Sequence, residues 1–325
     1  MKRIAINGFG RIGRMFFRLA SQNKNIDIIA INDIADIEVL VHLLKYDSIH
    51  GIFNEEITVK EDYIELNGKS IHFYNESDIE QLNWSILDVD IVIESSGNYK
   101  SYEDLYSHIN AGAKKVILTS PSPDPLINSI VLGVNDHNFN FNNNIISNAS
   151  CTTHSAAPLI DLIDQNWEIK SAYITTVHSF TNDQNLHDSP HQDFRRARAA
   201  HTSIIPTTTG AAKALTRIFP KMKNKIGGCG IRVPIPNGSL TDLTCIVNKF
   251  TNKDQVNEVF FNAQNKYLHY TKEPLVSVDI LGTKYSSIFD SGLTSVIGNM
   301  VKVVAWYDNE SGYSYRLIDL INKIN

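Results

Sequence analysis

The chain has 325 residues, 42% of them hydrophobic, and a formal net charge of −5 at pH 7. This length is enough for two domains with a sizeable core, and the acidic balance argues against strong nucleic-acid binding. The three cysteines are too few and too scattered for a disulfide framework or a Cys-x-x-Cys metal site, so we expect a reduced, cytoplasmic protein. No run of 18 or more apolar residues is present, and we therefore expect no membrane association.

The first predicted elements are a strand over residues 3–7 and a helix over residues 11–22, joined by a glycine-rich turn. Gly8, Gly10 and Gly13 form a Gly-x-Gly-x-x-Gly motif there. In a dinucleotide site the first glycine allows the tight turn, the second admits a pyrophosphate and the third lets the helix pack on the strand. The phosphate then meets the free N–H groups of the helix N-terminus. Alone the motif is weak, because a glycine turn without a ligand has the same pattern.

Asp33 supports the dinucleotide interpretation. A second strand is predicted over residues 28–31, and Asp33 follows it, 20 residues after Gly13. An acidic residue at this spacing hydrogen-bonds the ribose 2′-hydroxyl of NAD, and it repels the 2′-phosphate of NADP. The alternative is that Asp33 is the N-cap of a helix predicted over residues 37–44.

The rest of the first half alternates strands with helical stretches. This alternation predicts a parallel sheet with crossover helices, with further strands over residues 91–93, 116–118 and 145–146. Ser96 and Thr119 follow strand ends, where ligands collect in open α/β sheets. Residues 47–73 differ, because turn signals near Asp62 and at Asn67-Gly68 predict hairpin strands. We expect these hairpins at the edge of the sheet.

Cys151 is the candidate nucleophile. It lies in Ser150-Cys151-Thr152-Thr153, just before a helix predicted over residues 156–164. A helix N-terminus favours a thiolate, and the hydroxyl groups beside Cys151 could hold an anion. His178 ends a predicted strand over residues 175–178 and could pair with Cys151 as its base. The alternatives are a buried inert cysteine and a structural histidine, and only the combination argues against them.

A long polar segment follows His178. It carries Arg195, Arg196 and Arg198, residues whose fork-like donors suit phosphate, and then a threonine-rich run over residues 207–209. These arginines could equally form a solvated basic face or a subunit contact. Two histidines at positions 187 and 191 have the i, i+4 spacing of a metal site, but no third ligand is evident, so we expect no metal.

The chain resembles phosphorylating glyceraldehyde-3-phosphate dehydrogenase over essentially its whole length. Five blocks carry the resemblance in the right order, at residues 6–14, 44–51, 147–153, 206–213 and 306–314. The resemblance implies a Rossmann-type dinucleotide-binding domain plus an α+β catalytic domain with a mostly antiparallel sheet. It implies an NAD-binding domain over residues 1–149, with the C-terminal helix 313–325 packing back on it, and a catalytic domain over residues 150–312.

The resemblance also implies residue roles. Cys151 attacks the aldehyde of D-glyceraldehyde 3-phosphate, and His178 takes the hydroxyl proton as hydride leaves to NAD. Inorganic phosphate then attacks the thioester and gives an acyl phosphate. The implied cofactor contacts are Gly8, Gly10, Arg11, Ile12, Gly13, Asp33, Ser96, Thr119, Asn309 and Tyr313. The implied substrate and phosphate contacts are Ser150, Thr152, Thr181, Asp183, Arg195, Thr209, Gly210 and Arg232. A homotetramer is implied, with the loop over residues 178–205 at subunit contacts.

Three residues depart from the family pattern. His154 and Ser155 stand where the family usually has Asn-Cys, and His154 could alter the thiol or the packing one turn away. Gly238 stands where a β-branched residue is common, which we expect to loosen the strand after Arg232. Two rival functions remain open at this point: an erythrose-4-phosphate dehydrogenase, which releases its product with water, and a weakly catalytic homologue that binds RNA or a protein partner.

Overall fold

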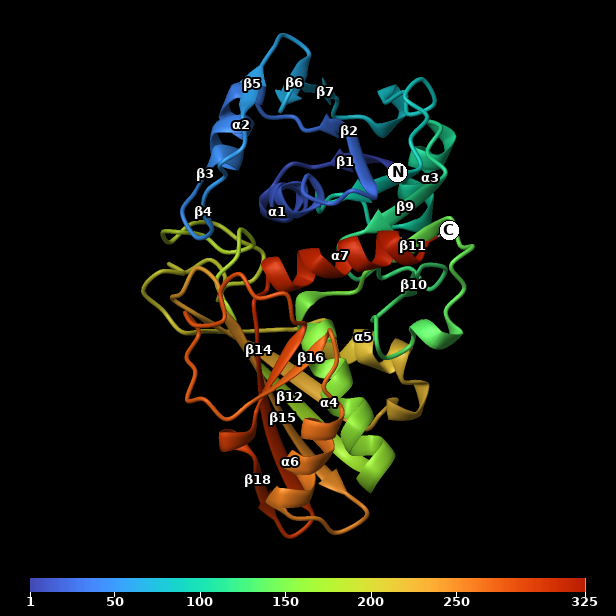
Figure 1. Cartoon of the computed structure of the whole chain (residues 1–325). Helices are drawn as coiled ribbons and strands as arrows, with labels where there is room; N and C mark the ends of the chain where they lie inside the picture. Colours follow the sequence, from blue (N-terminus) through green and yellow to red (C-terminus); the bar gives the residue numbers. More distant parts are fainter. Residues whose placement is uncertain (325) are drawn as a thin grey trace. The chain divides into compact units, whose positions relative to one another are not determined.

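A computed structural model describes residues 1–324, and Figure 1 shows the elements. The described chain divides into two compact units, one made of residues 1–130, 138–149 and 314–324, the other of residues 131–137 and 150–313. The last residue of the predicted C-terminal helix, Asn325, lies outside the described residues. Within the described part, no helix is long and apolar enough to cross a membrane.

The first unit is built on a nine-stranded sheet. In sheet order its strands are β10 (Asn128–Ser129), β11 (Ile145–Ser147), β9 (Lys115–Leu118), β8 (Ile91–Glu94), β1 (Lys2–Asn7), β2 (Ile26–Asn32), β7 (Lys69–Tyr74), β6 (Tyr63–Leu66) and β5 (Ile57–Val59). The strands from β10 to β7 pair in parallel, and β7, β6 and β5 pair antiparallel. The predicted parallel sheet and the hairpins at its edge are therefore confirmed.

Helices pack on this sheet through their apolar sides. They are α1 (Arg11–Ala20), α2 (Ile37–Lys45) and α3 (Tyr102–Asn110). The unit also contains α7 (Ser311–Lys323) from residue 314 on, the short 3₁₀ turn η1 (Ile79–Gln81) and a small ribbon of β3 (Tyr46–Asp47) and β4 (Gly51–Ile52). The 3₁₀ turn η2 (Asp136–Asn138) belongs mostly to the second unit. The α2 helix is capped by Asp36, whose carboxylate accepts from the Val39 N–H, so the alternative of Asp33 as N-cap is wrong. The α1 helix ends at Ala20, two residues before its predicted end.

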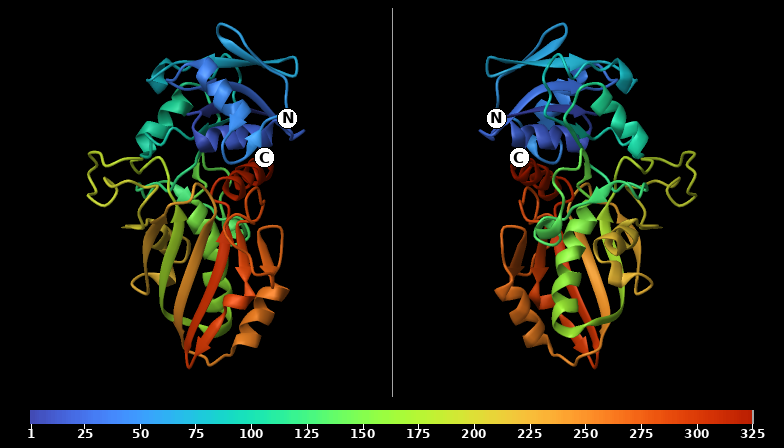
Figure 2. Two further views of the ribbon diagram at one scale, coloured as in Figure 1. Left: turned by 90° about the vertical axis from the view of Figure 1, so that its left-hand side faces the viewer. Right: turned by 90° about the vertical axis from the view of Figure 1, so that its right-hand side faces the viewer.

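The second unit has an eight-stranded, mostly antiparallel sheet, which Figure 2 shows from two sides. Its order is β13 (Ile205–Thr207), β14 (Ile226–Val233), β12 (Ile169–Ser179), β15 (Ser239–Val247), β19 (Met300–Tyr307), β17 (Ser287–Asp290) and β16 (Leu268–Thr271), with β18 (Ser295–Ile297) also on β19. Helix α4 (Cys151–Trp167) packs on β15 and β19. The other helical segments are α5 (Ala211–Ile218), α6 (Lys253–Asn262), η3 (Pro220–Met222) and η4 (Ser291–Leu293).

Gly238 shows why a glycine stands just before β15. Its φ is +87°, a region that side-chain-bearing residues rarely adopt, and a Cβ there would lie 2.4 Å from the Ser277 carbonyl oxygen. Its N–H donates to Asn237 Oδ1 at 2.8 Å. Gly238 thus lies just outside a strand, and it allows a close approach of two main-chain segments.

Candidate active site and cofactor site

Cys151 is the first residue of α4. Ser150 is the N-cap, with extended backbone, and its hydroxyl accepts from the Thr153 N–H at 3.1 Å. The helix begins five residues earlier than predicted because this cap stops it at Ser150 and not at Ala156. The thiol therefore lies in the first turn, where main-chain N–H groups give a partial positive charge.

Strand pairing brings a base and a cation to the thiol. His178 lies near the end of β12, and its Nε2 is 3.6 Å from Cys151 Sγ. Strand β14 pairs with β12 in a register that places Arg232 opposite His178. The Arg232 Nη1 atom lies 2.7 Å from His178 Nδ1 and 2.9 Å from the Ser179 carbonyl oxygen. Cys151, His178 and Arg232 thus form one cluster, which contains the predicted pair of Cys151 and His178.

The tautomer of His178 depends on its Nδ1 atom, which also lies 2.8 Å from the Ser179 carbonyl oxygen. Nδ1 either donates to this carbonyl or accepts from Arg232, but not both at once. When it donates, the lone pair of Nε2 faces the thiol, and His178 can act as a base toward Cys151. Arg232 then donates to the same Ser179 carbonyl.

Burial shifts the pKa values of Cys151 and His178 toward their neutral forms. Burial raises the pKa of the Cys151 thiol, while the Thr152 hydroxyl and the Arg232 charge oppose this rise. Burial and the adjacent Arg232 charge lower the pKa of His178 to about 3. Burial therefore favours the neutral forms of both groups, whereas the Arg232 charge favours the thiolate.

Sequence reasoning missed a buried hydroxyl cluster behind the thiol. The Tyr307 hydroxyl lies 2.9 Å from Thr152 Oγ1 and 2.7 Å from Thr176 Oγ1, and its pKa is raised by burial. Its ring meets the His178 ring edge-on at 6.0 Å. Thr152, predicted as a phosphate contact, is therefore engaged with Tyr307. The sequence signal for this cluster is weak: Tyr307 follows Trp306 at the end of an apolar strand.

The departures at positions 154 and 155 are buried in α4. His154 Nδ1 lies 3.1 Å from the Ser150 carbonyl oxygen, and its ring packs edge-on against Tyr313 at 5.9 Å. The Ser155 hydroxyl accepts from Thr241 Oγ1 at 2.9 Å. His154 therefore packs against a predicted cofactor residue, and its polar contact is with the N-cap residue of α4.

The loop over residues 178–205, which we call the polar loop, borders an open groove of about 680 Å³. The groove is lined by Asp183, His191, Gln192, Asp193, Arg196 and Thr208. Arg196 Nε lies 3.3 Å from Asp183 Oδ2, and Arg196 Nη2 donates to the Thr208 carbonyl oxygen at 3.4 Å. Arg195, the predicted phosphate contact, is exposed and does not line this groove. Adjacent arginines in one loop gave no sequence signal for choosing between them.

The remaining predicted phosphate contacts lie at element ends. The Thr209 hydroxyl accepts from the Ala211 N–H at 3.2 Å, and Gly210 is the N-cap of α5 with open space where a Cβ would stand. Thr181 is half-buried at the start of the polar loop.

The predicted cofactor residue Asn309 has a fixed amide orientation. Its Oδ1 atom accepts from the Ser179 and Ser239 hydroxyls at 3.0 and 2.8 Å, which leaves the amide N–H₂ as its donor.

The glycine motif has the tight packing that a dinucleotide site needs. Gly8 has a φ of +89°, and a Cβ on it would lie 2.3 Å from the Ser96 main-chain nitrogen. A Cβ on Gly13 would lie 2.3 Å from the Gly8 carbonyl oxygen. Gly10 is the N-cap of α1, without a side-chain cap, and has open space around it. The first-turn N–H groups, including that of Ile12, thus suit a pyrophosphate.

Charged residues flank this motif. The Asp33 carboxylate accepts from the Phe9 N–H at 2.6 Å and from the Ala35 N–H at 3.0 Å, so it lies against the glycine turn. Arg11 forms an ion pair with Asp47 at 2.9 Å. Among residues 1–324, no group of three or more His, Cys, Asp or Glu side chains could hold a metal ion.

Comparisons with known proteins agree over the whole chain. The model "Glyceraldehyde 3-phosphate dehydrogenase, NAD binding domain" matches residues 2–102, and the model of the C-terminal domain of the same family matches residues 150–309. The chain is 48% identical to "Glyceraldehyde-3-phosphate dehydrogenase 2" of Streptomyces avermitilis, covering 98% of this chain and 97% of that one. It is 48% identical to "Glyceraldehyde-3-phosphate dehydrogenase" of Priestia megaterium, covering 99% and 98%. It is 47% identical to "Glyceraldehyde-3-phosphate dehydrogenase" of Geobacillus stearothermophilus, covering 98% of this chain and 96% of that one. The chain belongs to the glyceraldehyde-3-phosphate dehydrogenase family.

Proposed function

We propose that the protein oxidises D-glyceraldehyde 3-phosphate in the presence of inorganic phosphate and yields 1,3-bisphosphoglycerate, with NAD as its cofactor. The single observation that carries this proposal is the placement of Cys151 Sγ 3.6 Å from His178 Nε2 at a helix N-terminus, in a chain that belongs to this family. NAD, when bound, accepts the hydride. All other chemistry falls to the side chains of the second unit.

The first step forms a carbon–sulfur bond. Cys151 attacks the aldehyde carbon while His178 Nε2, 3.6 Å from Sγ, takes the thiol proton. The proton returns to the aldehyde oxygen and gives a thiohemiacetal on Cys151. His178 then accepts the hydroxyl proton as the carbon loses hydride, and a thioester remains. A phosphate oxygen attacks the thioester carbon, the carbon–sulfur bond breaks, and Cys151 recovers a proton from His178.

We further propose that the predicted binding residues hold the three ligands. Asn309 donates its amide N–H₂ to the nicotinamide carboxamide, because its oxygen already accepts from two serines. Arg232 is half-buried beside His178, and its charge suits the phosphate groups. Arg196 joins Arg195 as a phosphate candidate because it lies in the groove with Thr208. The NAD-binding domain over residues 1–149, the catalytic domain over residues 150–312, the homotetramer and the cytoplasmic location belong to the same proposal.

The test is NADH formation at 340 nm from D-glyceraldehyde 3-phosphate and NAD, with and without inorganic phosphate. We expect strong phosphate-dependent turnover, its loss in Cys151→Ser, and its retention in the matched control Cys229→Ser. The Cys151→Ser variant should still bind NAD. Turnover that ignores phosphate would contradict the acyl-phosphate route and favour an erythrose-4-phosphate dehydrogenase. Full activity of Cys151→Ser would contradict the role of the thiol.

A further inference from the structure

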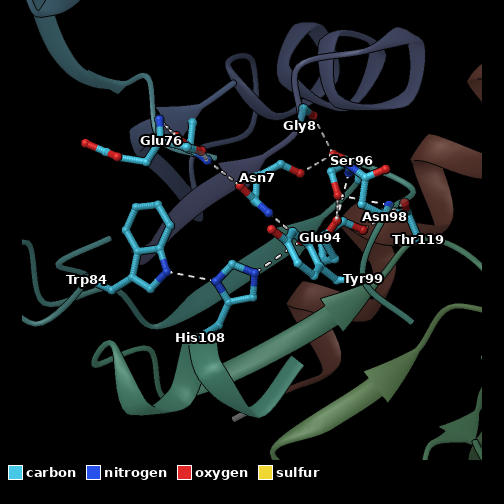
Figure 3. Close-up of polar contacts among 12 residues, drawn as sticks. Asn7, Gly8, Glu76, Trp84, Glu94, Ser96, Asn98, Tyr99, His108 and Thr119 are labelled. Atoms are coloured by element: carbon cyan, nitrogen blue, oxygen red, sulfur yellow. Dashed lines mark hydrogen bonds and ion pairs between the residues drawn. The ribbon is translucent and has the colours of Figure 1, made fainter. Parts of the chain in front are cut away.

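Glu94 is a buried carboxylate that the chemistry above does not use. It is the last residue of β8, and its exposed fraction is 0%. Four donors meet its two oxygens, as Figure 3 shows in part. The Ser96 N–H and hydroxyl donate to Oε1 at 2.8 and 2.5 Å, and Asn7 Nδ2 and His108 Nε2 lie 2.5 and 3.1 Å from Oε2. A carboxylate accepts only, so it satisfies all four.

Two histidine nitrogens and a tryptophan fix the direction of this network. Trp84 Nε1–H can only donate, and it lies 3.0 Å from His108 Nδ1. His108 Nδ1 must therefore accept, so its proton is on Nε2 and points to Glu94. Both rings are fully buried, and Trp84 is part of the apolar core of the first unit. His108 Nε2 can therefore only donate to the Glu94 carboxylate, and it cannot accept from it.

Glu94 also contacts both strand-end residues that we expect to touch the cofactor. Its side chain accepts twice from Ser96, and its main-chain carbonyl accepts from the Thr119 N–H at 3.0 Å and the Thr119 hydroxyl at 2.9 Å. The Ser96 hydroxyl in turn accepts from the Asn98 N–H at 3.2 Å. The turn that follows β8 is therefore shaped by Glu94 before any ligand arrives.

This turn is packed directly on the glycine motif. The Ser95 hydroxyl donates to the Gly8 carbonyl oxygen at 2.7 Å, and Gly8 approaches Ser96 too closely for any Cβ. Asn7, which donates to Glu94, accepts through Oδ1 from Asn32 Nδ2 at 2.7 Å. The ends of β8, β1 and β2 are thus tied together through one carboxylate.

We infer that Glu94 is a positioning residue that shapes the part of the cofactor site that receives the nicotinamide half of the dinucleotide. This rests on the proposed function. Asp33 at the end of β2 marks the adenosine side of the site, and β8 and β9 lie on the other side of β1 in the sheet. A dinucleotide crosses such a sheet from one half to the other, so Ser96 and Thr119 face the nicotinamide half.

The test compares NAD with ADP, which carries the adenosine and the two phosphates but no nicotinamide half. In Glu94→Gln one carboxylate oxygen becomes an amide N–H₂, which then faces donors from Ser96 or from Asn7 and His108. His108 and Asn7 cannot turn into acceptors there, because Trp84 donates to the other nitrogen of His108 and Asn32 donates to the Asn7 oxygen. We expect the Kd of NAD, measured by calorimetry on the intact protein, to rise about tenfold, as for a lost charged hydrogen bond. The Kd of ADP should stay unchanged within error.

Two further variants keep the test decisive. The matched control is Glu61→Gln, an exposed glutamate with the same change in charge, which should leave both Kd values unchanged. If Glu94→Gln does not fold, Trp84→Phe keeps an aromatic ring in the core and removes the donor that fixes His108. It should weaken NAD in the same direction, with ADP unaffected.

The outcomes separate this inference from the proposed function. Equal weakening of NAD and ADP, or no weakening of NAD, would overturn the positioning role of Glu94. Wild-type protein that does not bind NAD would overturn the proposed function itself. A rise confined to NAD, with unaltered thermal unfolding of the variant, supports the assignment.

Discussion

Arg232 is the residue whose charge most directly affects the reactive thiol. It lies beside His178, is half-buried, and opposes the rise that burial causes in the pKa of Cys151. Because the opposing charge is positive, it stabilises the thiolate relative to the thiol. Arg232 therefore has two effects in one position: it favours ionisation of the sulfur and disfavours protonation of the imidazole.

We predict that Arg232→Gln slows alkylation of Cys151 by iodoacetamide at pH 7. Loss of the positive charge removes a stabiliser of the thiolate, so the pKa of Cys151 rises further and the thiolate fraction at a fixed pH falls. The pH profile of the alkylation rate should move to higher pH. The exposed Arg198→Gln variant is the control and should keep the wild-type profile. A profile that stays in place in Arg232→Gln would show that this charge does not act on the sulfur.

At the scale of elements, Gly238 permits the chain to enter β15, the strand that pairs with both β12 and β19. We predict that Gly238→Ala lowers the thermal unfolding midpoint. The positive φ costs about 1–2 kcal/mol for a side-chain-bearing residue, and the clash with the Ser277 carbonyl adds to this cost. The matched control is Gly282→Ala, where φ is +77° and a Cβ would meet nothing within 4 Å. Calorimetry measures the unfolding midpoint of each variant.

That comparison separates strain from close approach. Both variants pay for the left-handed backbone, but only Gly238→Ala also displaces a neighbouring carbonyl. If the two midpoints fell by the same amount, the contact with Ser277 would carry no cost, and the backbone conformation alone would explain the glycine.

Much of the element pattern was predictable because it depends on local sequence. The strand–glycine–helix unit around Gly8 and the hairpin turn at Asn67-Gly68 follow from periodicity and turn chemistry, and both are found. The start of α4 was predicted too late. A serine cap followed by Cys, Thr, Thr, His and Ser at residues 151–155 conceals the helix start, because apolar periodicity begins only at Ala156.

The contacts that sequence reasoning missed are those that depend on which strands become neighbours. Tyr307 reaches Thr152 and Thr176 only because β15 lies between β12 and β19, which no local pattern specifies. The same is true of Trp84, His108 and Glu94, which lie on three separate segments. Cys151 could be named in advance because the block at residues 147–153 contains it, and His178 because it ends a predicted strand, whereas the contacts of Tyr307 could not.

At the scale of the whole molecule, the exposed apolar residues of the polar loop require an explanation. Leu186, Phe194 and Ile204 are 62%, 88% and 69% exposed. Large apolar side chains gathered on one polar loop are typical of an interface. This agrees with the proposed homotetramer, in which this loop forms subunit contacts.

We predict that Phe194→Asp weakens assembly. A carboxylate placed in an apolar contact must lose its hydration without gaining a partner, so the oligomer should dissociate at concentrations where the wild-type protein is assembled. Sedimentation velocity over a dilution series measures this. Phe250→Asp makes the same chemical change at a residue that is 82% exposed and lies between β15 and α6, outside the loop. Equal sedimentation of all three proteins would place the subunit contacts elsewhere, whereas dissociation of Phe194→Asp alone would assign the loop to the interface.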